Sequence, residues 1–194
     1  MLTWIILIVV AAVAVYAAAL FNSLVRTRQM ANEAWSGIDV QLKRRSDLVP
    51  NLVDSVKGYA AHERGVLDEV TRLRGEARAL PAGDVAGRAQ AEGALSLALG
   101  RLFAVAENYP DLKASNNFLA LQQQLSGLED DLQMARRYYN GTVRNLNTLV
   151  QSFPSNIIAH SFGFSERAYF EISDEAERAV PRVALAPAQP RAAP

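Results

Sequence analysis

The first 25 residues contain no Asp, Glu, Lys, Arg or His, and this apolar run constrains the chain more than any other feature. Residues Leu2–Phe21 are mostly Leu, Ile, Val and Ala, and Trp4 lies near one end. A helix of about 20 such residues crosses the ~30 Å hydrocarbon core of a bilayer, and Trp at its edge is typical of the membrane interface. The sequence therefore predicts a transmembrane anchor over residues 1–25.

Two other kinds of N-terminal segment also contain an apolar run. A cleaved signal peptide is the alternative, because Ala17-Ala18-Ala19 resembles a cleavage site, yet no Lys or Arg precedes the apolar run as in a signal peptide. A lipoprotein anchor needs a cysteine, and the chain has none. The absence of cysteine also excludes disulfides, zinc–thiolate sites and cysteine nucleophiles.

The charges next to the anchor predict its orientation. Arg26 and Arg28 follow the apolar run directly, and only the α-amino group precedes it. Because Lys and Arg accumulate on the cytoplasmic side of a span, we expect the N-terminus outside and the remainder in the cytoplasm, with an outward-facing domain as the alternative. Over the whole chain 20 Lys and Arg balance 20 Asp and Glu, so no basic field favours nucleic acid as a partner.

Beyond the anchor, apolar residues recur every three or four positions, which predicts an all-α fold. The anchor continues as a rod toward Arg45, and a second helix starts at Ser46 or Asp47 with Pro50 in its first turn. A third helix covers roughly residues 87–108. The second helix carries a seam at Leu52, Val56, Tyr59, Val66, Val70, Leu73 and Ala77, and the third has an apolar face at Leu95, Leu99, Leu102 and Ala106.

The strongest pattern belongs to a fourth helix, which starts at Asp111 or Ser115 and ends before Pro154. Its three-four spacing is the heptad period of antiparallel bundles and coiled coils. The seam consists of Phe118, Leu121, Leu125, Leu128, Leu132, Ala135, Tyr139, Thr142, Leu146, Leu149 and Phe153. We expect its partners to be the seams at residues 52–77 and 35–42.

The end of the chain divides into two parts. Residues 155–164 read as a turn and a short amphipathic segment, in which Ile157, Ile158 and Phe162 are the expected packing residues. The Ala/Pro-rich tail, residues 171–194, is expected to be disordered. The predicted organisation is therefore an anchor over 1–25, one helical bundle domain over 26–170 and this tail.

Several sequence blocks resemble the LemA family. The blocks are Ala34–Arg45, Asp47–Val53, Val56–Glu63, Tyr109–Ala114, Ala135–Asn140 and Phe153–Asn156. The resemblance implies a bacterial protein with an N-terminal anchor in the inner membrane, an antiparallel helical bundle and an outward N-terminus. Some members resemble lipoproteins with a Cys just before the position of Phe21, and this chain has no such Cys. Because the family includes both kinds of anchor, a periplasmic bundle is the alternative. The resemblance implies no reaction.

Catalytic motifs are not found. His62-Glu63 begins a zinc-protease pattern, but position 66, where the second His is required, is Val. Di-iron bundles need Glu three residues before His, and Tyr59 and Ile157 stand there before His62 and His160. Phosphate-binding glycine loops and Gly-x-Ser-x-Gly elbows are also missing from the sequence. We therefore predict no enzyme activity, no cofactor and no metal.

Nine polar residues form a candidate interaction patch: Asp39, Arg44, Arg45, Asp47, His62, Glu63, Arg136, Arg137 and Asn140. The first four are expected at the junction of the first two helices. They are either solvated faces, caps and ion pairs that fix helix register, or a recognition surface for another membrane protein. Contact of Lys43-Arg44-Arg45 with lipid is disfavoured, because a straight helix would place them ~30 Å beyond Phe21.

A small-residue stripe on the third helix, Ala89, Gly93, Ser96, Gly100 and Ala104, permits close helix approach. Taken together, the sequence predicts a non-catalytic scaffold or interaction module that organises membrane components. The expected partners are the lipid bilayer, other membrane proteins and a second copy in a homo-oligomer. The alternative is an adaptor or regulator of a membrane protease or envelope-stress system.

Overall fold

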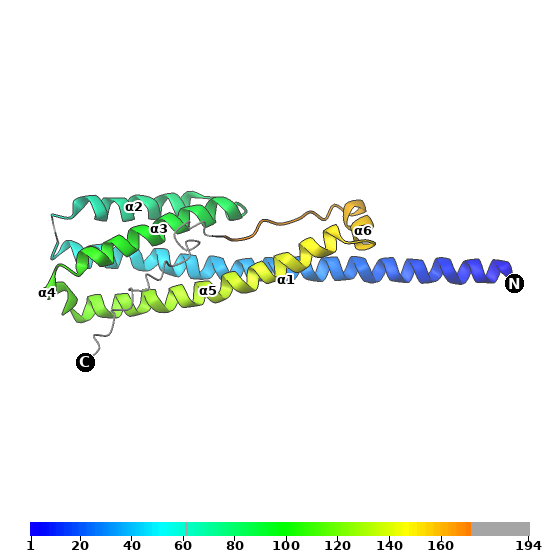
Figure 1. The fold of residues 1–194 in the computed structure, drawn as a ribbon, viewed down its shortest axis with the longest axis horizontal. Coiled ribbons are helices and arrows are strands. Elements are labelled where there is room, and N and C mark those ends of the chain that lie inside the picture. The colour runs from blue at the N-terminus through cyan, green and yellow to red at the C-terminus, as the bar shows by residue number, and fades with distance from the viewer. Residues whose placement is uncertain (61, 172–194) are drawn as a thin grey trace, which may run out of the picture.

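The computed structural model describes residues 1–60 and 62–171 and contains an elongated helical bundle built on one very long helix (Figure 1). Its elements are α1 (Leu2–Lys57), α2 (Arg64–Ala79), α3 (Val85–Ala106), α4 (Pro110–Lys113), α5 (Asn116–Gln151) and α6 (Ser155–Ser161). All regular structure in these residues is helical, which confirms the all-α prediction. Apart from Glu171, the predicted tail lies outside the described residues.

The N-terminal part of α1 extends alone beyond the bundle (Figure 1). In the part of the chain that the structure describes, it is the one segment long and apolar enough to cross a membrane, and none of its most apolar window is buried. Trp4 and the aliphatic residues around it are all exposed. The N-terminal part of α1 is therefore a candidate membrane span, as the sequence predicts.

The predicted junction at Ser46 and Asp47 is wrong, because α1 continues through Pro50 without a break. Proline has no N–H to donate to the carbonyl oxygen four residues earlier, which here belongs to Ser46. Arg74 of α2 donates its Nε–H to that oxygen instead, at 2.6 Å. A contact from a distant part of the chain thus stabilises a helix that local signals would end, and the chain turns only after Gly58.

Helix α5 runs antiparallel to α1 and packs mainly against it (Figure 1). The heptad seam is confirmed at alternate positions, which are fully buried: Phe118, Leu125, Leu132, Tyr139 and Leu146. Leu128 is only partly buried and Phe153 is 80% exposed, so the seam ends earlier than predicted. Toward the end of α5 the buried face also includes Thr142, Val143 and Val150, because α6 packs there in addition to α1. Tyr59, predicted on the second seam, lies in the α1–α2 turn and is exposed.

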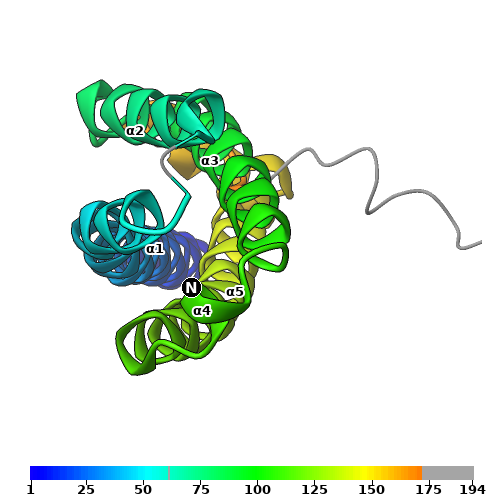
Figure 2. The same cartoon turned by 90° about the vertical axis from the view of Figure 1, so that its left-hand side faces the viewer.

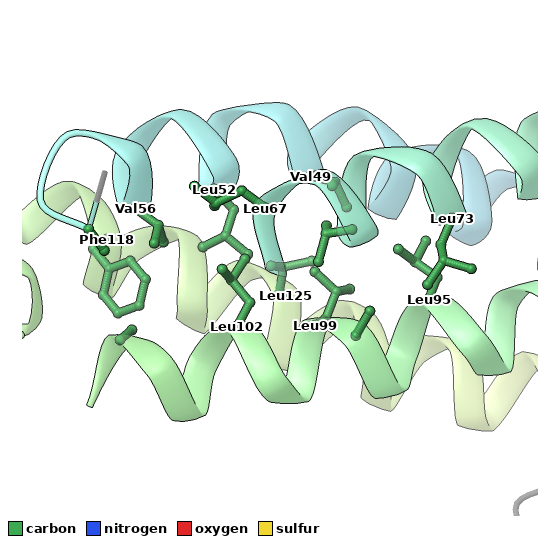
Figure 3. Packing of buried hydrophobic residues seen from close by; sticks show 14 of the residues in the cluster. Val49, Leu52, Val56, Leu67, Leu73, Leu95, Leu99, Leu102, Phe118 and Leu125 are labelled. Atoms are coloured by element: carbon green, nitrogen blue, oxygen red, sulfur yellow. The ribbon is translucent and has the colours of Figure 1, made fainter. Parts of the chain in front are cut away.

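The buried residues form three clusters along the bundle. At the end farthest from the candidate span, leucines and valines of α1, α2, α3 and α5 interdigitate (Figure 3), including the predicted Leu95, Leu99 and Leu102 face. The end view shows α2, α3 and α5 in an arc around α1 (Figure 2). A middle cluster joins α1 and α5 to Ala89 and Phe170. The third joins Leu24 of α1 to α5 and α6.

Candidate functional site

The nine residues predicted as an interaction patch lie in three regions of the bundle. Four of them, Asp39, Arg44, Arg45 and Asp47, lie within α1 and not at a helix junction, because α1 is continuous. His62 and Glu63 lie in the turn between α1 and α2. Arg136, Arg137 and Asn140 lie on α5. The structure brings Asp39 and Asp47 to one cleft, with Arg45 in the same helix.

Arg45 is the most deeply buried charged side chain described, at 1% exposed. One of its Nη groups donates to the Glu129 carboxylate of α5 at 2.6 Å and to Ser96 Oγ of α3 at 2.7 Å. The other Nη donates to the Glu92 carboxylate and, at 3.2 Å, to the Glu92 carbonyl oxygen. One guanidinium therefore connects three helices.

Burial and the neighbouring carboxylates change the pKa of Arg45 in opposite directions. Removal from water disfavours the charged guanidinium, but the carboxylates of Glu92 and Glu129 outweigh this effect and raise its pKa above the ordinary value. Two carboxylates on one guanidinium leave the cluster with a net negative charge, of which Glu129 is the more exposed member. The cluster holds α1, α3 and α5 in one register, and its charge is presented toward solvent on the α5 side.

Sequence reasoning selected Arg45 but missed both of its carboxylate partners. A signal for Glu92 existed, since it lies three residues before Leu95 and seven before Leu99 on the apolar face of α3. A charge on such a face is normally paired. Glu129 carried no comparable signal, because it is adjacent to the α5 seam and not on it. Ser96 was predicted only as a member of the small-residue stripe, whose Gly100 and Ala104 are exposed.

A polar cleft of about 190 Å³ lies between α1, α2 and α3, next to the Arg45 cluster. Asp39 accepts a hydrogen bond from Arg88 of α3 on one side. On the other side Lys43 donates to Asp47 at 2.7 Å, and this hydrogen bond lowers the pKa of Asp47 below its usual range. Arg44 is exposed on the same helix. Both aspartates of the predicted patch thus face the cleft already paired.

A second hollow, of about 400 Å³, lies between α3 and α5. Its walls are mainly apolar and include Leu99, Phe103 and Leu125, while Ser96 and Glu129 line it as well. Since these two residues also contact Arg45, the hollow borders the buried cluster. It has the composition expected of a site for apolar side chains with a polar group at one end.

Asn140 fastens the segment that follows α6. Residues 164–171, which we call the strap, return along α5 in an extended conformation (Figure 1). Asn140 exchanges two hydrogen bonds with the backbone of Phe170, and Asn147 does the same with Arg167. Seven helical residues span ~10.5 Å and three extended residues ~10 Å, so the spacings match. Asn140 therefore has a structural role.

The remaining predicted residues have simpler environments. Glu63 is partly buried and accepts a hydrogen bond from the Tyr109 hydroxyl at 3.3 Å. Burial, and then the Glu63 carboxylate, raise the pKa of Tyr109. His62 and Arg137 are exposed and Arg136 is partly buried. Within residues 1–60 and 62–171, no three His, Cys, Asp or Glu side chains are arranged to hold a metal ion.

The model of the LemA family matches residues 34–185, which is more than half of the chain. The chain belongs to the LemA family. It is 28% identical to protein LemA of Metamycoplasma hominis over 153 residues, which cover 79% of this chain and 69% of that protein. It is also 25% identical to magnetosome protein MamQ of Magnetospirillum gryphiswaldense, over 77% of this chain. The chain spans 64% of the length of that MamQ relative.

Proposed function

We propose that this LemA-family chain is a single-pass membrane protein whose helical bundle is a non-catalytic scaffold that organises other membrane components. The observation that carries the proposal is the continuity of α1 from the candidate span to the far end of the bundle. At 1.5 Å per residue its 56 residues extend ~84 Å, of which ~30 Å fill a bilayer. The bundle is therefore joined to the span without a hinge, so that the helix sets its distance from the membrane.

The surface of the bundle supports a binding role. The hollow between α3 and α5 offers apolar walls beside the negative Glu129, and the cleft of Asp39 and Asp47 offers paired charges. Surfaces of this kind suit a helix of another membrane protein or of a second copy. The MamQ relatives are named after the magnetosome and not after a reaction, which agrees with an organising role.

For orientation, we propose that the N-terminus is outside and the bundle is in the cytoplasm. Arg26 and Arg28 follow the span directly and favour this arrangement. A periplasmic bundle is the alternative. The two are distinguished by alkaline phosphatase fused after Phe170, which is active only outside the cytoplasm. An inactive fusion is expected, and an active one would reverse the orientation.

An adaptor or regulator of a membrane protease or envelope-stress system is the alternative function. Its partner would be a single protein in a fixed ratio, whereas a scaffold self-associates or collects several components. Purification of the full chain from its native membrane in mild detergent, followed by mass measurement of the intact complexes, separates these cases. We expect complexes that contain more than one copy of the chain, and one copy bound to one partner in a defined ratio would overturn the scaffold proposal.

A further inference from the structure

The α5–α6 turn and α6 lie at the level where the candidate span ends. The span needs about 20 residues from Leu2, which places Phe21 at the edge of the hydrocarbon. The Phe21 ring lies 4.9 Å from that of Phe162 and 5.9 Å from that of Phe164, centroid to centroid. Figure 1 shows α6 beside α1 at the point where α1 leaves the bundle. If Phe21 lies at the edge of the bilayer, the end of α6 therefore lies at that edge as well.

Large apolar side chains are exposed at this end of the bundle. Phe153 is 80% exposed, Phe162 61% and Ile157 55%. The same segment is nevertheless well packed on its other side, where Ala159 and Phe164 are buried against α1 and α5. The predicted packing role of Ile157 and Phe162 thus holds only in part, because both present much of their surface outward. Phe162 connects this exposed apolar surface to Phe21 at the end of the candidate span.

Arginines outnumber acidic residues at this end, where Glu166, next to Arg167, is the nearest acidic residue. No Asp or Glu occurs between residues 1 and 32 or between residues 132 and 165, although the chain has 20 acidic residues. Arg26, Arg28 and Arg144 lie in these two segments, and the Arg28 guanidinium stands 4.7 Å from the centre of the Phe164 ring. Arginines around exposed aromatic residues are suited to the headgroup layer of an anionic membrane.

We propose that residues 153–162, the tip of the bundle, insert Phe153, Ile157 and Phe162 into the interfacial layer of the bilayer that α1 crosses. The inference rests on the proposed membrane anchoring. A second contact beside the span opposes any tilt of the rod that would lift the tip out of the interfacial layer. It also explains why apolar side chains are exposed at the tip.

The absence of cysteine allows a direct test with single labels. The full chain with Ile157→Cys, carrying a small fluorescent label, is reconstituted at low density into vesicles of phosphatidylcholine and phosphatidylglycerol. Quenching by iodide in the water is compared with quenching by brominated lipid. Met134→Cys is the matched control, because Met134 and Ile157 are both 55% exposed. Met134 lies near the middle of α5, well away from the tip. A third label at Val13→Cys reports whether the anchor itself is inserted.

The expected result is several-fold weaker iodide quenching and clearly stronger lipid quenching at position 157 than at 134, with position 13 quenched by lipid alone. Phe153→Cys and Phe162→Cys should behave like Ile157→Cys. If position 13 is inserted but position 157 is as open to iodide as 134, the tip does not touch the membrane. Protection from both quenchers at position 157 would mean that protein covers the tip, which also overturns the proposal. If position 13 is open to iodide, the anchoring itself fails.

Discussion

At the scale of single residues, the buried guanidinium of Arg45 is the feature on which the register of the bundle depends. Arg45→Ala leaves the Glu92 carboxylate, 5% exposed, without its partner. Removal of one member of a buried ion pair costs about 3–5 kcal/mol of unfolding free energy. The neighbouring Arg44→Ala is the control, because Arg44 is exposed and its loss should change stability by less than ~0.5 kcal/mol. Equal denaturant midpoints for the two variants would contradict the role given to Arg45.

Tyr139 should make the stability of the bundle sensitive to alkaline pH. Burial raises the pKa of its phenol, an effect that Arg167 partly opposes, and the hydroxyl donates to the Ala168 carbonyl at 3.0 Å. Because the folded-state pKa lies above the unfolded value, this stabilisation is complete below about pH 10 and is lost as pH rises through the folded pKa. We expect Tyr139→Phe to unfold with a weaker pH dependence above about pH 10 than the unmodified chain.

The control for this prediction is the adjacent residue. Tyr138 is 53% exposed, and Tyr138→Phe should keep the full alkaline loss of stability. Thermal unfolding followed by circular dichroism at a series of pH values measures both variants. Identical pH profiles for Tyr138→Phe and Tyr139→Phe would show that the Tyr139 phenol does not carry the effect.

The residues of the site show how far sequence reasoning reaches. A charged or polar residue in an amphipathic helix can be recognised from the sequence, as Arg45 and Asn140 show. Their partners, Glu129 for the first and the backbone of the strap for the second, are distant in sequence. Such pairings depend on how helices align in space, which a periodicity of 3.6 residues does not contain. The sequence allows the nine polar residues to be selected. It does not reveal that they lie in three separate regions of the bundle, namely α1, the α1–α2 turn and α5.

At the scale of elements, α1 illustrates a local signal that a tertiary contact overrides. Ser46, Asp47 and Pro50 are residues that normally begin a helix, and a break was therefore predicted there. The hydrogen bond from Arg74 to the Ser46 carbonyl removes the need for that break. Helix content could be predicted along the chain because apolar spacing is a strong signal, but the end of α1 could not.

This explanation predicts an energetic coupling between Arg74 and Pro50. Arg74→Ala should cost about 1–3 kcal/mol, because the Ser46 carbonyl loses its donor. In a chain that also carries Pro50→Ala, the new N–H can bond to that carbonyl, so Arg74→Ala should cost less. A double-mutant cycle by chemical denaturation should give a coupling of about 0.5–3 kcal/mol. Strictly additive effects would mean that Arg74 does not compensate for the proline.

The seam of α5 gives a further prediction at this scale. Leu132 is 3% exposed, whereas Leu128, one turn earlier, is only partly buried. Truncation to Ala at a fully buried leucine costs about 2–5 kcal/mol through lost burial and the remaining cavity. Leu132→Ala should therefore lower the denaturant midpoint well below that of Leu128→Ala. The reverse order would place the packed face of α5 elsewhere.

At the scale of the whole molecule, one helix links the candidate span to the far end of the bundle. Residues 2–16 of α1 are exposed and apolar, and the helix is packed against α5, α6 and α2 from Leu24 onward. A break within this helix would uncouple the bundle from the membrane, and the proposed scaffold would lose its fixed geometry. The proposed scaffold therefore depends on the continuity of α1 through residues 46–50.

The most direct test of this continuity is a distance between spin labels at Gln29→Cys and Asp54→Cys, two exposed positions of α1 on either side of Ser46 and Pro50. The chain has no other cysteine. The labels are measured by pulsed electron resonance in the full chain, reconstituted into vesicles. A continuous helix predicts a single narrow distribution near ~38 Å, which is 1.5 Å for each residue between the labels. A broad distribution, or a clearly shorter distance, would show a break in the helix and contradict the account.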